Sequence, residues 1–165
     1  MKIQKIDVSV GIIAGLACLF MMVNVPVWPM FIGWAWYFAL LPGGAPFKRG
    51  TPPLICGGLL GVLAVILIDL FSGFMPFMPS VVFAVMITAF LLMLSAKIPM
   101  FSFSLVSFNA YTTMFAGYYT NIFWDTGNYW TNFISALLLI TGANFFGLIL
   151  GWLSVATADI GKKAE

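Results

Sequence analysis

The chain has no histidine among its 165 residues, and its one glutamate is the C-terminal Glu165. Only 7% of the residues are charged. Catalysis by acids and bases, like metal binding, needs clustered His, Cys, Asp or Glu side chains, and no such cluster can be assembled here. We therefore expect no enzyme, no metal site and no cofactor. The net charge of +2 is too small to indicate a nucleic-acid partner.

Hydrophobic residues, in contrast, make up 62% of the chain. They form six apolar stretches that are long enough, or nearly so, to cross a bilayer. Cys18 and Cys56 lie inside these stretches, where a thiol acts as a small hydrophobic group. We expect an all-α polytopic membrane protein with one integral domain over 1–165. Its six transmembrane helices are expected at residues 7–25, 27–42, 53–74, 79–96, 99–119 and 129–157.

The basic residues all fall on one side of this expected topology. Cytoplasmic loops of membrane proteins are enriched in Lys and Arg. If the N-terminus is cytoplasmic, every basic residue is cytoplasmic and the opposite loops have none. The basic residues are Lys2, Lys5, Lys48, Arg49, Lys97, Lys162 and Lys163. We therefore expect both termini in the cytoplasm.

The two halves of the chain show a weak internal similarity. A shift of 77 residues aligns Phe31 with Phe108 and Phe38 with Phe115. The same shift lays the first three stretches over the last three. Because each half would have an odd number of spans, a repeat would be inverted in the membrane, as in many transporters. The sequence leaves open whether the two halves are inverted three-helix repeats.

Polar side chains gather in the fifth and sixth stretches. Asn109, Thr112 and Thr113 are spaced three and four residues apart, which indicates one helix face. Such residues can line a solute path, or they can form hydrogen bonds between packed helices. Both interpretations stay open. The candidate path residues here are Ser107, Asn109, Thr112, Thr113 and Asn144.

Asp69 is the only ionisable side chain that falls well inside an expected span. Charged groups within membranes are costly and often functional, so Asp69 could titrate a proton or accept a hydrogen bond from a solute. Hydration at the outer interface is the alternative. Gly43 and Gly44 interrupt the second stretch, and interrupted spans can mark binding sites. Asp69, Gly43 and Gly44 complete the list of candidate path residues.

Three Gly-x-x-x-Gly patterns predict close helix packing, within one subunit or between subunits. They begin at Gly11, Gly57 and Gly147. Since six spans of this size form a thin bundle, we expect a homo-oligomer.

Several short motifs resemble a bacterial inner-membrane family known as domain of unknown function 1097. They are Gly33, Tyr37-Phe38-Ala39 and Gly43-Gly44 in the first half, and Ala96-Lys97, Ser102-Phe103, Thr113 and Phe115-Ala116-Gly117 in the second. The resemblance implies a small polytopic protein of the bacterial inner (cytoplasmic) membrane. It implies no activity and no functional residue.

Taken together, these features predict a channel or facilitator for a small uncharged or weakly acidic solute, with the path lined by the second and fifth stretches and in part by the sixth. A leucine at Asn109 should then suppress flux. The near-absence of buried charge argues against fast ion conduction. Two alternatives remain: a non-transporting membrane subunit that packs with a partner complex, and a proton-coupled transporter that uses Asp69.

Overall fold

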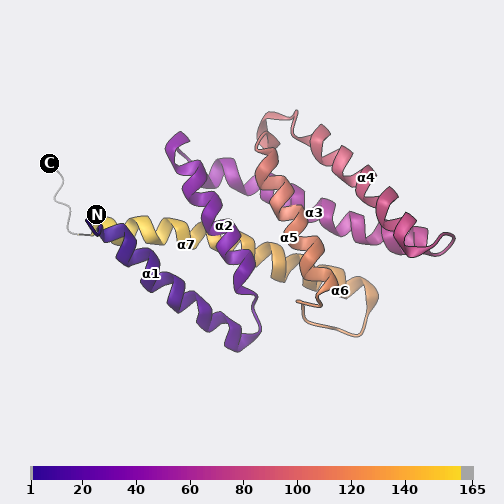
Figure 1. Ribbon diagram of the computed structural model, residues 1–165, viewed down its shortest axis with the longest axis horizontal. Coiled ribbons are helices and arrows are strands. Elements are labelled where there is room, and N and C mark those ends of the chain that lie inside the picture. Colours follow the sequence, from indigo (N-terminus) through magenta and orange to yellow (C-terminus); the bar gives the residue numbers. More distant parts are fainter. Residues whose placement is uncertain (1, 161–165) are drawn as a thin grey trace.

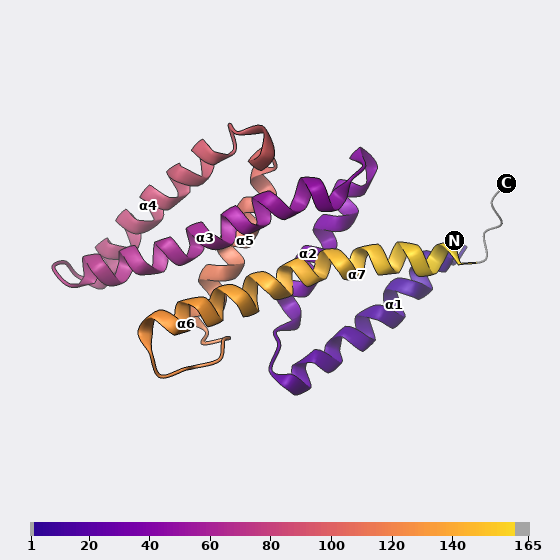
Figure 2. The same cartoon turned by 180° about the vertical axis from the view of Figure 1, so that it is seen from behind.

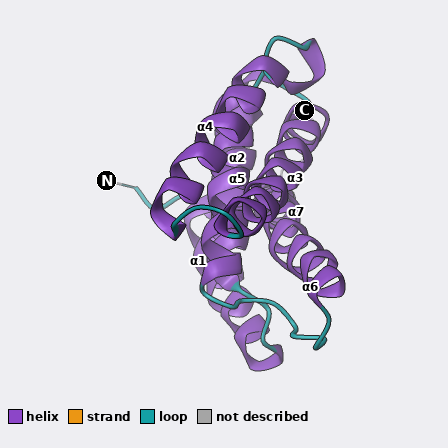
Figure 3. Ribbon diagram, turned by 90° about the vertical axis from the view of Figure 1, so that its right-hand side faces the viewer, coloured by secondary structure: helices purple, strands orange, loops and turns teal. Residues whose placement is uncertain are grey.

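The computed structural model describes residues 2–160, and the chain is helical apart from short connections (Figures 1 and 3). No strand occurs within this range, which confirms the all-α fold class. The α-helices are α1 Lys5–Ala17, α2 Val27–Leu40, α3 Pro46–Ser72, α4 Phe77–Ser95, α5 Ser104–Tyr119, α6 Tyr129–Ala136 and α7 Gly142–Asp159. Three 3-10 turns occupy Cys18–Val23, Leu41–Gly43 and Pro99–Phe101, and the π-helical segment Leu137–Thr141 joins α6 to α7.

Within residues 2–160, four helical segments are long and apolar enough to cross a membrane. They are 5–23, 46–72, 77–95 and 129–159. The two other helices are shorter: α2 has 14 residues and α5 has 16. At 1.5 Å per residue they are about 21 and 24 Å long, against about 30 Å for the hydrocarbon core of a bilayer. The chain is therefore a membrane protein with several apolar helices.

The start of α3 differs from the sequence prediction. The helix begins at Pro46 rather than near residue 53, so Lys48–Arg49 lie in its first turn and not in a loop. Proline suits the first turn of a helix. The left-handed backbone of Gly44–Ala45 turns the chain early enough for Pro46 to take this position. The later prolines at 52–53 are then accommodated inside the helix.

The first expected span, 7–25, consists of α1 up to Ala17 and of a 3-10 helix over Cys18–Val23. The other helices begin and end within a few residues of the expected positions, except for the start of α5. α5 begins at Ser104 instead of residue 99. Pro99–Phe101 forms a separate 3-10 turn, and Phe103 leaves the helical region with ψ 72° before α5 starts. The fifth stretch therefore provides a shorter helix than its apolar length suggests.

The helices form two crossing layers. In Figure 1 the short helices α2 and α5 pass in front of the long helices, and in Figure 2, seen from behind, α3 and α7 lie in front. The most extensive contacts join α5 to α3 and α2 to α7. α4 packs along α3, and α1 packs against α7. Each short helix is thus seated on a long helix from the other half of the chain.

Glycine lets α2 lie directly on the backbone of α7. A Cβ added at Gly33 would overlap the carbonyl of Asn144, and a Cβ added at Gly147 would overlap the carbonyl of Met30. One turn further along α7, a Cβ at Gly151 would overlap the ring of Tyr37. Such backbone approach is the usual role of small residues in membrane helices.

α5 is seated on α3 in the same manner. A Cβ added at Gly57 would overlap the carbonyl of Ser107, and a Cβ at Gly61 would approach the side chain of Met114 to 2.8 Å. The second and third Gly-x-x-x-Gly patterns therefore mediate packing within the subunit.

The first Gly-x-x-x-Gly pattern, which begins at Gly11, does not mediate packing within the subunit. A Cβ added at Gly11 or Gly15 would meet no atom within 4 Å, because both residues lie on an exposed face of α1. Within the described residues this face has no partner, and the expected homo-oligomer stays a prediction.

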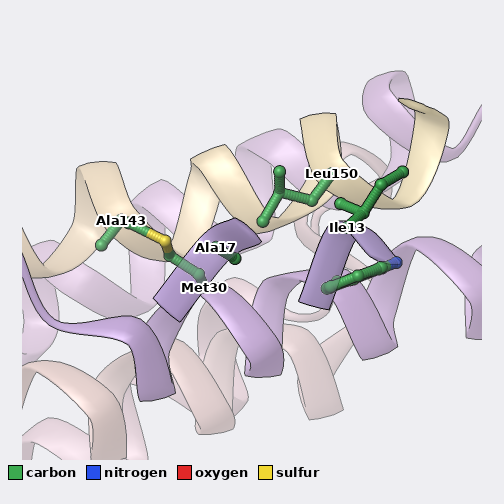
Figure 4. Close-up of a cluster of buried hydrophobic side chains, with 6 residues drawn as sticks. Ile13, Ala17, Met30, Ala143 and Leu150 are labelled. Carbon is green, nitrogen blue, oxygen red and sulfur yellow. The ribbon is translucent and has the colours of Figure 1, made fainter. Parts of the chain in front are cut away.

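Four apolar clusters form the core of the described residues, and the two largest include α2 and α7. The first joins α1 to α2 and α7, as the labelled side chains in Figure 4 show. It consists of Ile13, Ala17, Met30, Trp34, Ala143 and Leu150. The second lies where α2, α3, α5 and α7 meet, and it consists of Tyr37, Leu40, Leu54, Val106, Ala110 and Leu148. Both clusters combine residues from the two halves of the chain.

Candidate functional site

A large cavity opens between the α1–α2 turn and the segment that precedes α6, which lie at the same end of the molecule (Figure 1). Its volume is about 840 Å³. We call it the loop cavity. Its lining residues are Cys18, Met21, Asn24, Val25, Pro26, Val27, Trp28, Phe31, Asn121, Ile122, Phe123, Trp124 and Asp125. Its walls are therefore mainly apolar and aromatic, with two amides and one carboxylate.

A second cavity of about 330 Å³ lies next to the loop cavity, and we call it the inner cavity because it adjoins the α2–α7 interface. The exposed side chains of Phe20 and Leu138 also line it, so it opens at the surface of the bundle. Val25 and Trp124 line both cavities, so these two side chains form the boundary between them. The inner cavity extends to the π-helical segment through Leu138 and Leu139. π-Helical turns occur often at functional sites. Met30 and Ala143 also line this cavity, which brings it next to the packed interface of α2 and α7.

A third cavity, of about 410 Å³, shares Asn121, Phe123 and Asp125 with the loop cavity. It is completed by Tyr118 and Asn132. All three cavities thus use the segment 121–125. This segment is the structural centre of the candidate site.

The segment 121–125 is held by specific contacts rather than by regular secondary structure. Asn121 has a left-handed backbone, with φ 55°. Ser135 donates a hydrogen bond to the carbonyl of Trp124, with 2.8 Å between Oγ and O. The ring of Phe123 stacks on Tyr118, with the ring centroids 5.2 Å apart, and Tyr118 stacks in turn on Phe133. These contacts fix the position of the aromatic wall of the loop cavity.

Asp125 is fixed at the rim of the loop cavity. Its Oδ1 accepts hydrogen bonds from the backbone N–H of Gly127 and from the side-chain amide of Asn132, each with a donor–acceptor distance of 2.9 Å. These two donors hold the pKa of Asp125 below its usual range. The carboxylate is therefore ionised at neutral pH.

Three polar atoms are buried without a hydrogen-bond partner among the described residues. They are Nε1 of Trp34, Oγ of Ser107 and Oδ1 of Asn144. Such atoms are uncommon, because each loses its water on burial and gains nothing in return. Trp34 and Asn144 face the interface of α2 and α7, and Ser107 lies in the interface of α5 and α3. These unpaired atoms thus lie in the packed interfaces where the halves of the chain meet, and none of the three residues lines a cavity described above.

The predicted path residues on α5 are not gathered on one face. Thr113 is buried, Asn109 is half-buried and Thr112 is exposed. Each side chain bonds to a carbonyl of its own helix one turn earlier: Thr113 to Asn109, Asn109 to Leu105 and Thr112 to Phe108. This back-bonding satisfies polar groups inside an apolar helix without any partner helix. None of the three lines a cavity described above.

Asp69 is exposed, and it accepts a hydrogen bond from the hydroxyl of Tyr129 at 2.8 Å. The bond ties the end of α3 to the start of α6. Asp69 lines none of the three cavities. Its contact with Tyr129 is thus a link between two helices, and the proposed proton-coupling role stays a prediction.

Gly43 and Gly44, the other predicted path residues, are also exposed, and both lie next to the guanidinium of Arg49. The Nη1 atom of Arg49 donates to the carbonyls of Leu40 at 3.1 Å and Gly44 at 3.3 Å. Its guanidinium lies 4.4 Å from the ring centroid of Phe103. Arg49 therefore neutralises the C-terminal end of α2 and pins it to the start of α5.

The match to a known family covers nearly the whole chain. A family model described as "Protein of unknown function (DUF1097)" matches residues 7–159. The chain belongs to the DUF1097 family. The resemblance to this family seen in the sequence motifs is thus confirmed. No curated protein and no solved structure matches the chain.

The sequence of this DUF1097 protein gave little indication of two residues of the candidate site. Trp34 lies in an apolar run, where its indole looks like one more hydrophobic group. Trp124 lies in an expected external loop, where it looks like one of the Trp and Tyr residues that are enriched at membrane surfaces. A signal was present only for Trp34, since a buried Trp needs a partner for its N–H, whereas Trp124 is exposed. Trp34 packs between α1, α2 and α7, and the position of Trp124 beside two cavities depends on the loop backbone.

Proposed function

We propose that this DUF1097 protein is a facilitator for a small uncharged solute, which passes from the loop cavity past Val25 and Trp124 into the inner cavity. The observation that carries the proposal is that these two cavities share Val25 and Trp124 in their walls. Asn144, whose Oδ1 is buried and unpaired, lines neither cavity. Ala143, which lines the inner cavity, is the chain neighbour of Asn144. An unpaired acceptor beside such a path is suited to an N–H or O–H donor on a neutral solute.

Charge favours the uncharged solute over the weak acid. Asp125 lines the loop cavity, and no Lys or Arg lines any of the three cavities. An anion approaching the loop cavity would be repelled by Asp125 and would find no positive partner.

The proposal includes two inverted three-helix repeats. Met30 and Ser107, which lie 77 residues apart, each place a carbonyl against a glycine. Those glycines, Gly147 and Gly57, are themselves 90 residues apart. The offset of the glycines is larger than that of the carbonyls because more residues separate α5 from α7 than separate α2 from α3. In Figure 1, α2 and α5 run in opposite directions, as do α3 and α7. Equivalent contacts with reversed directions are what an inverted repeat requires.

We further propose six crossings, with both termini on the cytoplasmic side of a bacterial inner membrane. In Figure 1 the α2–α3 connection lies at the upper left, the α4–α5 connection at the top and the N-terminal end at the left. The other three connections lie toward the lower right. Lys5, Lys48, Arg49 and Lys97 belong to the first group, which agrees with the positive-inside rule. Lys162 and Lys163 lie outside the described residues.

Cysteine labelling tests the six crossings. In a variant with Cys18 and Cys56 replaced by serine, Thr126→Cys should react with a membrane-impermeant maleimide added to spheroplasts. Lys97→Cys should react only after the membrane is permeabilised. If α2 and α5 did not cross, residue 97 would lie on the same side as residue 126. Labelling of both positions from outside would therefore contradict the proposal.

Transport is tested by stopped-flow light scattering on proteoliposomes. Urea, acetamide and glycerol serve as uncharged solutes, and formate and acetate serve as anions. We expect faster entry of at least one uncharged solute than in empty liposomes, and no gain for the anions because of Asp125. Folded, inserted protein that accelerates none of the solutes would remove the facilitator and favour the partner-subunit alternative.

A further inference from the structure

The loop cavity has an unusual combination of walls and charge. Trp28, Phe31, Phe123 and Trp124 supply four aromatic rings, and Asp125 supplies the one charge of the lining. Aromatic faces attract cations through their negative π-electron density, and the attraction is strongest for tryptophan. A carboxylate beside such rings adds a second attraction of the same sign. Neutral and anionic ligands gain from neither.

The charge is held in place rather than carried on a mobile side chain. Both hydrogen bonds to Asp125 end on Oδ1. No hydrogen bond to Oδ2 is found among the described residues, so one oxygen remains available to a ligand. The Oδ1 atom of Asn132 accepts from the backbone N–H of Thr126 at 2.8 Å, which anchors the segment on both sides of Asp125. The rim is therefore preorganised.

We propose that the loop cavity binds a hydrophobic organic cation, such as an aryl-alkyl quaternary ammonium ion. The cavity volume of about 840 Å³ lies within the range of about 300–1,000 Å³ that is typical of ligand sites. A lipid chain needs only an apolar groove, whereas this cavity also has Asn24 and Asn121 in its walls and Asp125 at its rim. The site goes beyond the proposed transport function and does not depend on it.

The test compares three ligands that share a phenyl ring: benzyltrimethylammonium, neutral N-benzylacetamide and anionic 3-phenylpropionate. Binding to the full chain in nanodiscs of neutral lipid is measured by isothermal titration calorimetry, with empty nanodiscs as the control. The cation should bind more tightly than both other ligands. Binding of the cation no tighter than that of N-benzylacetamide would overturn the proposal without any variant.

Two matched variants locate the charge effect. Asp125→Asn keeps an oxygen for the Gly127 and Asn132 donors, so it should fold. It should weaken cation binding about threefold to fivefold, as expected for an exposed ion pair, and leave the binding of N-benzylacetamide unchanged. Asp69→Asn removes a carboxylate at a position outside the cavity, and it should leave the binding of both ligands unchanged. Equal losses in the two variants would assign the preference to general surface charge and would contradict a site at Asp125.

Discussion

Replacing Gly33 by alanine is expected to lower the free energy of unfolding by about 3 kcal/mol. The added Cβ would overlap the backbone carbonyl of Asn144, and a backbone atom cannot move aside as a flexible side chain can. α2 would have to separate from α7 along the interface that joins the two halves. Gly57→Ala should have a similar effect, since its Cβ would overlap the carbonyl of Ser107. Reversible unfolding by sodium dodecyl sulfate in mixed micelles, followed by circular dichroism, measures both.

Gly11→Ala is the matched control for these substitutions. Gly11 also lies within a helix and begins a Gly-x-x-x-Gly pattern, but an added Cβ would meet nothing within 4 Å. Alanine is the better helix former, so stability should be unchanged or rise by up to about 1 kcal/mol. The packing described here would be refuted if Gly33→Ala and Gly11→Ala had the same stability.

Asn144→Leu should make the protein more stable and less active. Oδ1 of Asn144 is buried and unpaired, so leucine of similar size should add about 1 kcal/mol to the free energy of unfolding. If the amide holds the solute, losing one hydrogen bond should reduce flux about tenfold. The unfolding and proteoliposome assays together separate these effects. Reduced flux accompanied by lower stability would indicate damage to the fold and would not support a path beside Asn144.

Asn109→Leu decides between two positions of the path. The sequence alone predicts that this change suppresses flux. In the structure the Asn109 amide donates to the carbonyl of Leu105 in its own helix. Neither Asn109 nor Asn144 lines a cavity, but Asn144 follows Ala143 of the inner cavity, whereas no chain neighbour of Asn109 lines any of the three. A path beside Asn144 therefore predicts that flux is retained. Suppression by Asn109→Leu but not by Asn144→Leu would move the path to α5.

The positions of most helices could be predicted because proline and glycine mark their ends. Pro26 precedes α2, and Gly43 follows it, close to the expected bounds. α3 was less predictable, since prolines occur at 46, 52 and 53 and any of them suits a first turn. Local sequence cannot rank these alternatives. The choice depends on the left-handed turn at Gly44–Ala45.

The candidate site was harder to predict than the helices. A soluble helix shows its buried face as an apolar stripe, but a membrane helix is apolar all round. The Gly-x-x-x-Gly pairs identified the packing faces of α3 and α7, yet not which helix each receives. The polar residues of α5 were also ambiguous, since Thr113 satisfies its hydroxyl within its own helix. The cavities depend on Asn24 and Asn121, whose left-handed backbones no pattern revealed.

The π-helical segment Leu137–Thr141 sets the rotational phase between α6 and α7. A π-helical turn holds about one residue more than the α-helical turn it replaces, and one residue corresponds to about 100° of rotation. Upstream of it, Phe133 and Ser135 face Tyr118 and the loop carbonyl of Trp124. Downstream, Asn144 faces α2. The π-helical segment therefore turns the side chains of α7 by about 100° relative to those of α6, and the continuous helix contacts Tyr118 and the loop on one side of the segment and α2 on the other.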